Sequence, residues 1–251
     1  TITMRMRVLL SAVSVLLLVL LAPAFARPAV VGKKKLCLGI LAFRPKQETR
    51  ALWEPVIAQV NRSLPGHEIS LEVLTYQEID EALQMHRLDF VLTNPSHYIE
   101  IRRRYSMTGV LATLVEQQGR NALSAYGGMI IARSDRSDLN KIADLRNRTI
   151  SIAGKNSLGG YQAQAFEMLR AGIDLPTGAR LITRGMPQDQ VVQDVLDGTA
   201  DAGFVRSGLV EQMAAEGKLE LGKIKIINRQ DVPHFPYALS THLYPEWPFI
   251  A

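Results

Sequence analysis

The stretch Ala153-Gly-Lys-Asn-Ser-Leu-Gly-Gly-Tyr161 decides the fold, because it joins an apolar strand to a long amphipathic helix. β-Branched residues dominate the predicted strand, Thr149–Ile152, and apolar residues recur at helical spacing over 162–170. The first N–H groups of a helix have no partner within it, and the helix dipole favours negative charge there. A serine hydroxyl and two glycines lie at this point, and glycine lets a ligand approach the backbone closely. The stretch therefore predicts a strand-to-helix turn that binds a small anion.

Strand and helix patterns alternate along the rest of the chain. Such alternation favours parallel-rich sheets covered by helices, so the sequence predicts an α/β fold. Besides the strand at 149–152, we expect strands at 36–42, 69–74, 90–92, 129–132, 180–183, 202–205, 224–227 and 237–241. We expect helices at 49–64, 76–86, from Asn94-Pro95 to about 104, and at 142–145, 161–171, 188–196 and 208–216.

The alternation restarts after the polar stretch 116–121, which predicts two lobes. The chain would cross between the lobes twice, and two crossings form a hinge. Ligands of such folds bind between the lobes, where strands end and helices begin. The predicted boundaries are lobe 1 at 35–117 plus 236–251, lobe 2 at 126–228, and hinge crossings at 118–125 and 229–235.

Residues 1–26 have the pattern of a secretory signal peptide. Arg5 and Arg7 precede an apolar run, and Ala24-Phe25-Ala26 is typical of a cleavage site, so we expect cleavage before Arg27 and export to the periplasm. An uncleaved signal that anchors the chain to the membrane is the alternative.

Composition excludes several classes of protein. The chain is 47% hydrophobic and 21% charged, which is ordinary for a globular protein. Loss of Arg5 and Arg7 lowers the 29 basic residues to 27 against 24 acidic ones, a net charge of +3. This small excess, without interleaved aromatic residues, argues against nucleic acid as a partner. The single cysteine, Cys37, excludes an intramolecular disulfide.

No motif in the sequence indicates catalysis, a metal or a cofactor. The five histidines lack metal-ligand spacing, and there is no Gly-x-Ser-x-Gly turn. Asp189 and Asp201 lie where caps or turn residues are expected. An enzyme that acts on a small anion is a further alternative. In that case Ser157→Ala should abolish the rate of turnover far more than the affinity for the anion.

Several segments, taken in order, resemble a known family. They are Tyr126–Asp135, Ile142–Ile150, Ser157–Tyr161, Gly185–Gln190 and Leu196–Gly203, together with the turn Asn94-Pro-Ser-His-Tyr98. In this order and spacing they resemble the phosphonate, phosphate and phosphite substrate-binding proteins of ABC importers. That resemblance implies a type II periplasmic-binding fold over residues 36–241, with a sheet flanked by helices in each lobe.

The chain departs from that family at the anion turn. Phosphonate binders typically have several hydroxyls there, in a Ser-Thr-Ser-Gly type of run, whereas only Ser157 keeps one here. Arg206 follows a predicted strand at the expected cleft wall. Fewer hydroxyls and one guanidinium suit a larger or more dispersed oxyanion.

Ser157–Tyr161, Phe204–Arg206 and Leu243–Pro248 are more similar to the periplasmic sensor domains of two-component histidine kinases, including tetrathionate sensors. This similarity implies binding of a small oxyanion, tetrathionate-like or phosphonate-like. The partner would be a membrane-embedded kinase segment, or an ABC permease in the importer alternative. Sensors of this type continue with a further helix, a transmembrane segment and the kinase. We therefore expect the chain, which stops at Ala251, to be truncated.

The predicted ligand-binding residues come from three junctions and their surroundings. Ser157, Gly159 and Gly160 are expected to contact the anion, with Leu158 and Tyr161 shaping the same turn. The complete set is Phe43, Asn94, Ser96, Tyr98, Tyr126, Ser157, Leu158, Gly159, Gly160, Tyr161 and Arg206.

Overall fold

A computed structural model describes residues 32–118, 121–175 and 177–251. The chain separates into two units, 1–34 and 35–251, and the second is described below. The predicted signal peptide, 1–26, lies outside the described residues. Among those residues, none of the helices has the length and apolarity needed to span a bilayer.

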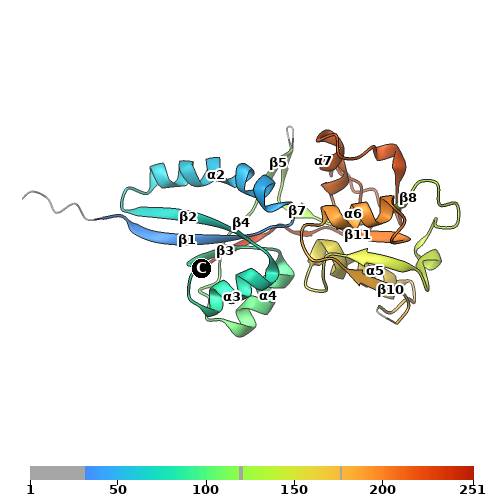
Figure 1. Ribbon diagram of the computed structural model, residues 1–251, viewed down its shortest axis with the longest axis horizontal. Coiled ribbons are helices and arrows are strands. Elements are labelled where there is room, and N and C mark those ends of the chain that lie inside the picture. The colour runs from blue at the N-terminus through green and yellow to red at the C-terminus, as the bar shows by residue number, and fades with distance from the viewer. Residues whose placement is uncertain (1–31, 119–120, 176) are drawn as a thin grey trace, which may run out of the picture. The chain divides into compact units, whose positions relative to one another are not determined.

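The first main sheet has five strands. Their order is β2 (His67–Leu74), β1 (Lys34–Leu41), β3 (Phe90–Leu92), β14 (Pro248–Ile250) and β4 (Val110–Thr113). β1 and β3 are parallel, whereas β14 is antiparallel to β3 and β4. In Figure 1, α2 (Lys46–Ser63) lies on one side of this sheet, and α3 (Tyr76–Gln84) and α4 (Pro95–Arg104) lie on the other side.

The second main sheet also has five strands. Their order is β10 (Arg180–Thr183), β9 (Thr149–Ile152), β11 (Ala202–Arg206), β8 (Gly128–Arg133) and β12 (Ile224–Ile227). β9 is parallel to β10 and β11, and β8 is antiparallel to β11 and β12. The helical segments are η1 (Ile142–Leu145), η2 (Leu158–Gln162), α5 (Ala163–Arg170), α6 (Asp189–Leu196), α7 (Leu209–Ala215) and η3 (Leu221–Lys223).

Alternate side chains of β8 enter different cores, as a two-residue strand period requires. Ile130 packs in the core with residues of α5 and η1, and Ile131 packs in the core with residues of α6 and α7. Both faces of the second sheet are therefore buried. A third core lies around the first sheet and includes Ile40, Val91 and Trp247.

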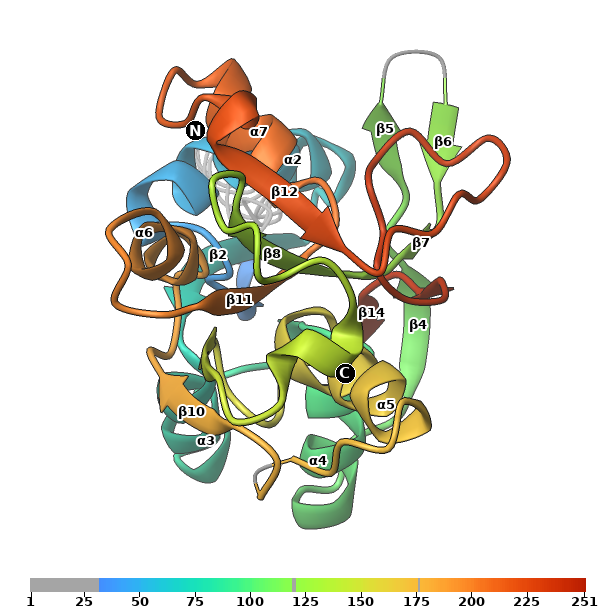
Figure 2. The ribbon, with the colours of Figure 1, turned by 90° about the vertical axis from the view of Figure 1, so that its right-hand side faces the viewer.

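Short strands lie between the two sheets in sequence. They are β5 (Glu116–Gln118), β6 (Asn121–Leu123), β7 (Ala125–Tyr126) and β13 (Tyr244–Pro245). β5 and β6 form an antiparallel hairpin, which Figure 2 shows leading into β7. β7 pairs with β13, so the two passages of the chain between the sheets run side by side.

The predicted α/β architecture is confirmed, with helices on the faces of both sheets, although each sheet is mixed because β14 and β8 run antiparallel to their neighbours. The strand predicted at 237–241 is wrong, since this segment makes only the isolated bridge between Gln230 and Leu239. Ser240 Oγ accepts a hydrogen bond from Ile130 N at 2.8 Å and donates one to Ile227 O at 2.6 Å. These side-chain bonds hold the segment without a strand ladder. The lobe boundaries stay a prediction.

Candidate functional site

A small cavity, which we call the inner pocket, lies where strands of both main sheets end. Its volume is about 10 Å³, and the carboxyl ends of β3, β9 and β11 supply part of its wall. Its lining residues are Tyr76, Asn94, Tyr126, Ser157, Gly159, Met186, Gln188, Arg206 and Trp247. Five of the predicted residues meet here: Asn94, Tyr126, Ser157, Gly159 and Arg206. Ser157, Gly159 and Arg206 lie together because the parallel strands β9 and β11 present their carboxyl ends at one edge of the second sheet. Asn94 follows β3 of the first sheet and Tyr126 lies on β7.

The turn after β9 begins the π-helical segment η2 at Ser157. The Ser157 hydroxyl is the N-cap and accepts a hydrogen bond from Gly160 N at 3.1 Å. The predicted free N–H of Gly160 is therefore already bound, because the capping serine satisfies it. The Ser157 hydroxyl also interacts with that of Tyr76, and this interaction opposes the effect of burial on the pKa of Tyr76.

Both glycines of this turn are required by close packing. A Cβ at Gly159 would lie 2.8 Å from the Tyr126 ring, and one at Gly160 would lie 2.7 Å from Ser157 Oγ. Any side chain at either position would displace a residue that lines the inner pocket. The glycines therefore set the size of the pocket, while Gly160 itself does not line it.

On the opposite wall, Asn94 is the N-cap of α4. Its Oδ1 accepts hydrogen bonds from Ser96 N at 3.0 Å and His97 N at 3.1 Å, and its Nδ2 donates to Tyr76 Oη at 2.8 Å. The Tyr76 ring packs edge-on against the His97 ring. Burial lowers the pKa of His97 to about 4, so this imidazole is neutral at physiological pH.

Arg206, at the end of β11, is fully engaged by neighbouring groups. Its Nη2 lies 2.5 Å from Glu246 Oε1 and 3.0 Å from Glu116 Oε1. The guanidinium carbon also lies 4.5 Å from the ring centroid of Tyr126, with the rings of Phe43 and Trp247 at 5.3 and 5.7 Å. Burial raises the pKa of Glu246, an effect that the Arg206 charge opposes. The positive charge expected to face an anion is thus already paired with carboxylates.

Two buried polar atoms of the lining residues, Tyr126 Oη and Trp247 Nε1, make no hydrogen bond of normal geometry. Their polar interaction is with each other, and it opposes the effect of burial on the pKa of Tyr126. Burial raises the pKa of Tyr126 well above its usual range, so the phenol stays protonated. Buried donors nearly always have full hydrogen bonds in native proteins, so these two donors favour a polar ligand in the inner pocket.

A second cavity, which we call the outer cavity, has a volume of about 880 Å³. It shares two lining residues, Arg206 and Trp247, with the inner pocket. Of the predicted residues only Phe43 and Arg206 line it. Much of its remaining wall comes from α2 and α7, including Leu52, Trp53, Val56, Leu209 and Ala215. We take the inner pocket as the candidate site, because the predicted residues and the two buried donors converge there.

The other predicted residues lie beside the inner pocket. Ser96 and Tyr98 belong to α4, Leu158 packs against the core of the first sheet, and Tyr161 lies in a core of the second sheet. These side chains hold the turns in place and do not line the pocket.

Sequence reasoning missed four lining residues: Tyr76, Met186, Gln188 and Trp247. Met186 and Gln188 belong to the Gly185–Gln190 motif, and Trp247 belongs to the Leu243–Pro248 motif. These two motifs were therefore the sequence signal that could have identified Met186, Gln188 and Trp247 as lining residues. Tyr76 begins α3 and had no such signal.

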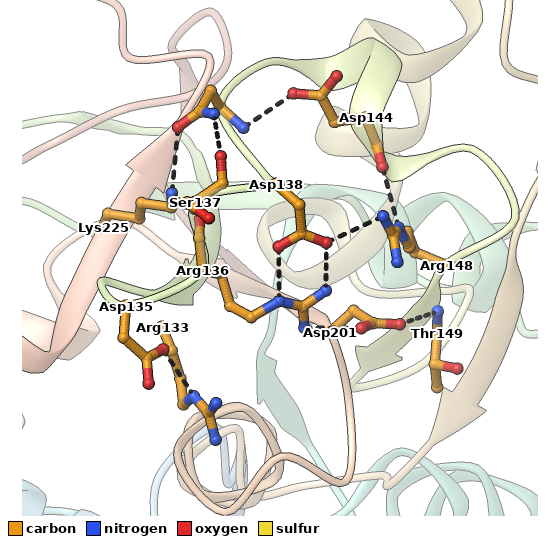
Figure 3. Close-up of polar contacts among 11 residues, drawn as sticks. Arg133, Asp135, Arg136, Ser137, Asp138, Asp144, Arg148, Thr149, Asp201 and Lys225 are labelled. Carbon is orange, nitrogen blue, oxygen red and sulfur yellow. Dashed lines mark hydrogen bonds and ion pairs between the residues drawn. The ribbon is translucent and has the colours of Figure 1, made fainter.

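Asp189 and Asp201, the two carboxylates considered for acid–base chemistry, lie in ion pairs. Asp189 Oδ1 accepts from Arg44 Nε at 2.8 Å, and Asp201 Oδ1 accepts from Arg136 Nη1 at 2.7 Å. Asp201 belongs to a charged network, shown in Figure 3, at the amino ends of β9 and β11. Within the described residues, no group of three or more His, Cys, Asp or Glu side chains is placed to hold a metal.

Comparison with known families gives one match over most of the chain. The family described as the periplasmic substrate-binding protein of phosphonate ABC transporters matches residues 38–251. The tetrathionate sensor histidine kinase TtrS of Salmonella typhimurium is 26% identical over 214 residues, which are 85% of this chain and 36% of the kinase. The chain thus spans little more than a third of that relative.

Two solved structures show the same fold. The binding component of an ABC phosphonate transporter from Pseudomonas aeruginosa has a TM-score of 0.69 at 14% identity, over 87% of this chain and 68% of that one. PhnD1 from Prochlorococcus marinus, in complex with methylphosphonate, has a TM-score of 0.67 at 13% identity, over 87% and 76%. These likenesses confirm the predicted type II periplasmic-binding fold.

Proposed function

Because the chain belongs to the family of periplasmic substrate-binding proteins of phosphonate ABC transporters, we propose that it binds a small oxyanion in the inner pocket. The buried donors Tyr126 Oη and Trp247 Nε1, which make no hydrogen bond of normal geometry, carry this proposal. The hydroxyls of Tyr76 and Ser157, which interact with each other, add a further donor on the same lining. Converging neutral donors stabilise an anion when water is excluded.

Binding must involve movement of the pocket walls. A cavity of about 10 Å³ holds at most one water, so an oxyanion enters only when the walls separate. The walls come from residues attached to both main sheets, and the paired strands β7 and β13, where the chain passes between the sheets, would allow hinge motion. The ligand's preference for the closed state would supply the free energy of closure.

We place this binding in the ligand-sensing domain of a two-component sensor kinase. The relative that supports this role is a sensor kinase, and this chain matches it over 85% of its own length. In this role, lobe closure passes a signal to a membrane-embedded kinase segment. Substrate delivery to an ABC permease is the second candidate, supported by the family match and by the two structural neighbours. The coding sequence after Ala251 and the adjacent genes distinguish the two roles. A transmembrane helix and a kinase encoded after Ala251 would support the sensor, whereas adjacent genes for a permease and its ATPase would support the transporter.

Thermal unfolding of the purified protein tests the binding proposal. The panel is methylphosphonate, phosphite, phosphate, sulfate, methanesulfonate, thiosulfate and tetrathionate. An anion at about 100 times its Kd should add about 2.7 kcal/mol and raise the unfolding midpoint. In the Ser157→Ala variant the same anion should raise the unfolding midpoint by less, where the rise is measured from the midpoint of that variant without anion. Ser63→Ala, at the exposed end of α2, is the matched control and should leave it unchanged. Absence of any shift across the panel would refute the proposal.

A further inference from the structure

We propose that the inner pocket selects oxyanions that carry no proton, the anions of strong acids such as sulfonates, over protonated phosphorus oxyanions. The inference rests on the proposed function, since it specifies the ligand class of the same pocket. It follows from which lining atoms are free to donate and which are free to accept.

The main side-chain acceptors of the pocket already have partners. Asn94 Oδ1 accepts from two backbone N–H groups, of Ser96 and His97. Gln188 Oε1 accepts from Arg206 N at 2.8 Å. Ser157 Oγ accepts from Gly160 N at 3.1 Å. These oxygens are therefore directed to the protein backbone.

The groups that remain are donors. Asn94 Nδ2 donates to Tyr76 Oη, and the Tyr76 and Ser157 hydroxyls interact with each other, so one proton of these two hydroxyls stays available for another acceptor. Gln188 Nε2 is 3.4 Å from Ser157 Oγ, at the outer limit of a hydrogen bond. Tyr126 Oη and Trp247 Nε1 make no hydrogen bond of normal geometry and interact with each other. The indole N–H can only donate, so the Tyr126 hydroxyl keeps its proton for another acceptor. Burial raises the pKa values of Tyr76 and Tyr126, so both phenols keep their protons across the physiological range.

Strong acceptors are missing from the nine described residues that line the pocket, none of which is Asp, Glu or His. Glu116 and Glu246 are the carboxylates beside it, and both bind Arg206. His97 lies behind Tyr76, and its Nδ1 is 2.8 Å from Thr93 Oγ1. A monoprotonated oxyanion brings an O–H that needs an acceptor, and here that O–H would face other donors. An unsatisfied buried hydrogen-bonding group of this kind reduces affinity about tenfold or more.

Matched anions test this inference with the unmodified protein. Methanesulfonate and methylphosphonate share their shape, and at about pH 6 each carries one negative charge, but only the phosphonate has an O–H. Calorimetric titration at that pH should give at least about tenfold tighter binding of methanesulfonate. Sulfate against phosphate at about pH 8.5, where phosphate is mainly the monoprotonated dianion, should show the same order. Methanesulfonate keeps one negative charge throughout this pH range. Any change of its affinity with pH therefore comes from the protein, including protonation of Glu246, Glu116 or His97, and the ratio of the two affinities corrects for that change. Towards about pH 9, as methylphosphonate loses its proton, the ratio should fall.

A single-atom exchange provides the second measurement. Gln188→Glu keeps an oxygen that can accept from Arg206 N and replaces Nε2 by an acceptor oxygen. This variant should bind methanesulfonate more weakly and should bring the two affinities at about pH 6 together or reverse their order. Gln193→Glu, at an exposed position of α6, is the control for an added charge outside the pocket and should keep the preference of the unmodified protein.

Two outcomes would overturn the inference. Methylphosphonate binding at about pH 6 as tightly as methanesulfonate would show that the pocket provides an acceptor, and the oxyanion-binding function would stand. A ratio that stays constant between about pH 6 and pH 9 would also overturn it. Failure of every anion in the panel to bind would remove both proposals together.

Discussion

At Arg206 the local sequence and the tertiary structure lead to different expectations. A single arginine after an apolar strand indicates a free cation at the cleft wall. In the structure its guanidinium is 6% exposed and binds the side chains of Glu246 and Glu116, while three aromatic rings surround it. Its contact with a ligand stays a prediction. Its place in the lining of both the inner pocket and the outer cavity is a structural finding.

Replacing Arg206 alone should destabilise the protein strongly. Glu246 is 1% exposed, so Arg206→Met would leave a buried carboxylate without its partner. Breaking a buried pair in this way costs about 3–5 kcal/mol. Urea unfolding monitored by tryptophan fluorescence measures the loss.

The double variant Arg206→Met with Glu246→Gln separates the structural role from ligand contact. Removing both charges should restore much of the stability, because no unpaired charge stays buried. If the guanidinium also contacts the anion, the double variant should still bind about 1.5–3 kcal/mol more weakly. Unchanged anion affinity in the double variant would exclude Arg206 from the binding set.

At the scale of elements, the two ends of β9 and β11 have different roles, one at the inner pocket and one in a charged network. Their carboxyl ends lead to Ser157 and Arg206 at the inner pocket. Their amino ends carry the charged network of Figure 3, in which Asp201 accepts from Arg136 Nη1 at 2.7 Å and from Thr149 N at 2.9 Å. This network fixes the start of β9 against β11 and is remote from the pocket along the strands.

Asp201→Ala should therefore lower stability without changing anion binding. The variant leaves Thr149 N and Arg136 without this acceptor, which costs about 1–2 kcal/mol at a partly exposed site. Chemical unfolding and anion titration on the same preparation check both parts. Loss of anion affinity in a variant that is still folded would show that the charged network also contributes to anion binding, and would contradict these separate roles.

At the scale of the whole described unit, Arg44 ties the two sheets together. It follows β1 and is 3% exposed, and its guanidinium binds Asp189 of α6 at 2.8 Å and Glu216 after α7 at 2.7 Å. Nearby, Gln188 N donates to Phe43 O at 2.9 Å. These contacts join the chain after β1 to helices of the second sheet, so they stabilise the arrangement in which the inner pocket is closed.

Arg44→Met should weaken that closed arrangement. We expect a loss of about 2–3 kcal/mol in unfolding free energy at neutral pH, together with weaker anion binding. Arg50→Met, on the exposed side of α2, is the matched control and should change neither quantity appreciably. An unaltered anion affinity in Arg44→Met would mean that this cluster does not contribute to closure.

The stability difference between Arg44→Met and the unmodified protein should depend on pH. The hydrogen bond from Arg44 lowers the pKa of Glu216 from 4.5 to about 2, although burial opposes the change. A carboxylate with a depressed pKa stabilises the fold above its unfolded value, and this contribution is lost as pH falls from about 4.5 to about 2. Unfolding free energies of both proteins between neutral pH and about pH 3 should therefore converge on acidification.

The sequence by itself determined the α/β class, the anion-type turn at Ser157 and the meeting of Asn94, Tyr126, Ser157, Gly159 and Arg206. It could do so because periodicity and capping are local signals, and because strand ends share one edge of a sheet. Only the tertiary structure decided that Gly160 N is capped, that Arg206 is neutralised, and that Tyr76, Gln188 and Trp247 complete the pocket. The partners of Arg206 lie 40 and 90 residues away in sequence, where no local pattern records the contact. The burial of the Tyr126 hydroxyl and the Trp247 indole N–H likewise exists only once the chain is packed.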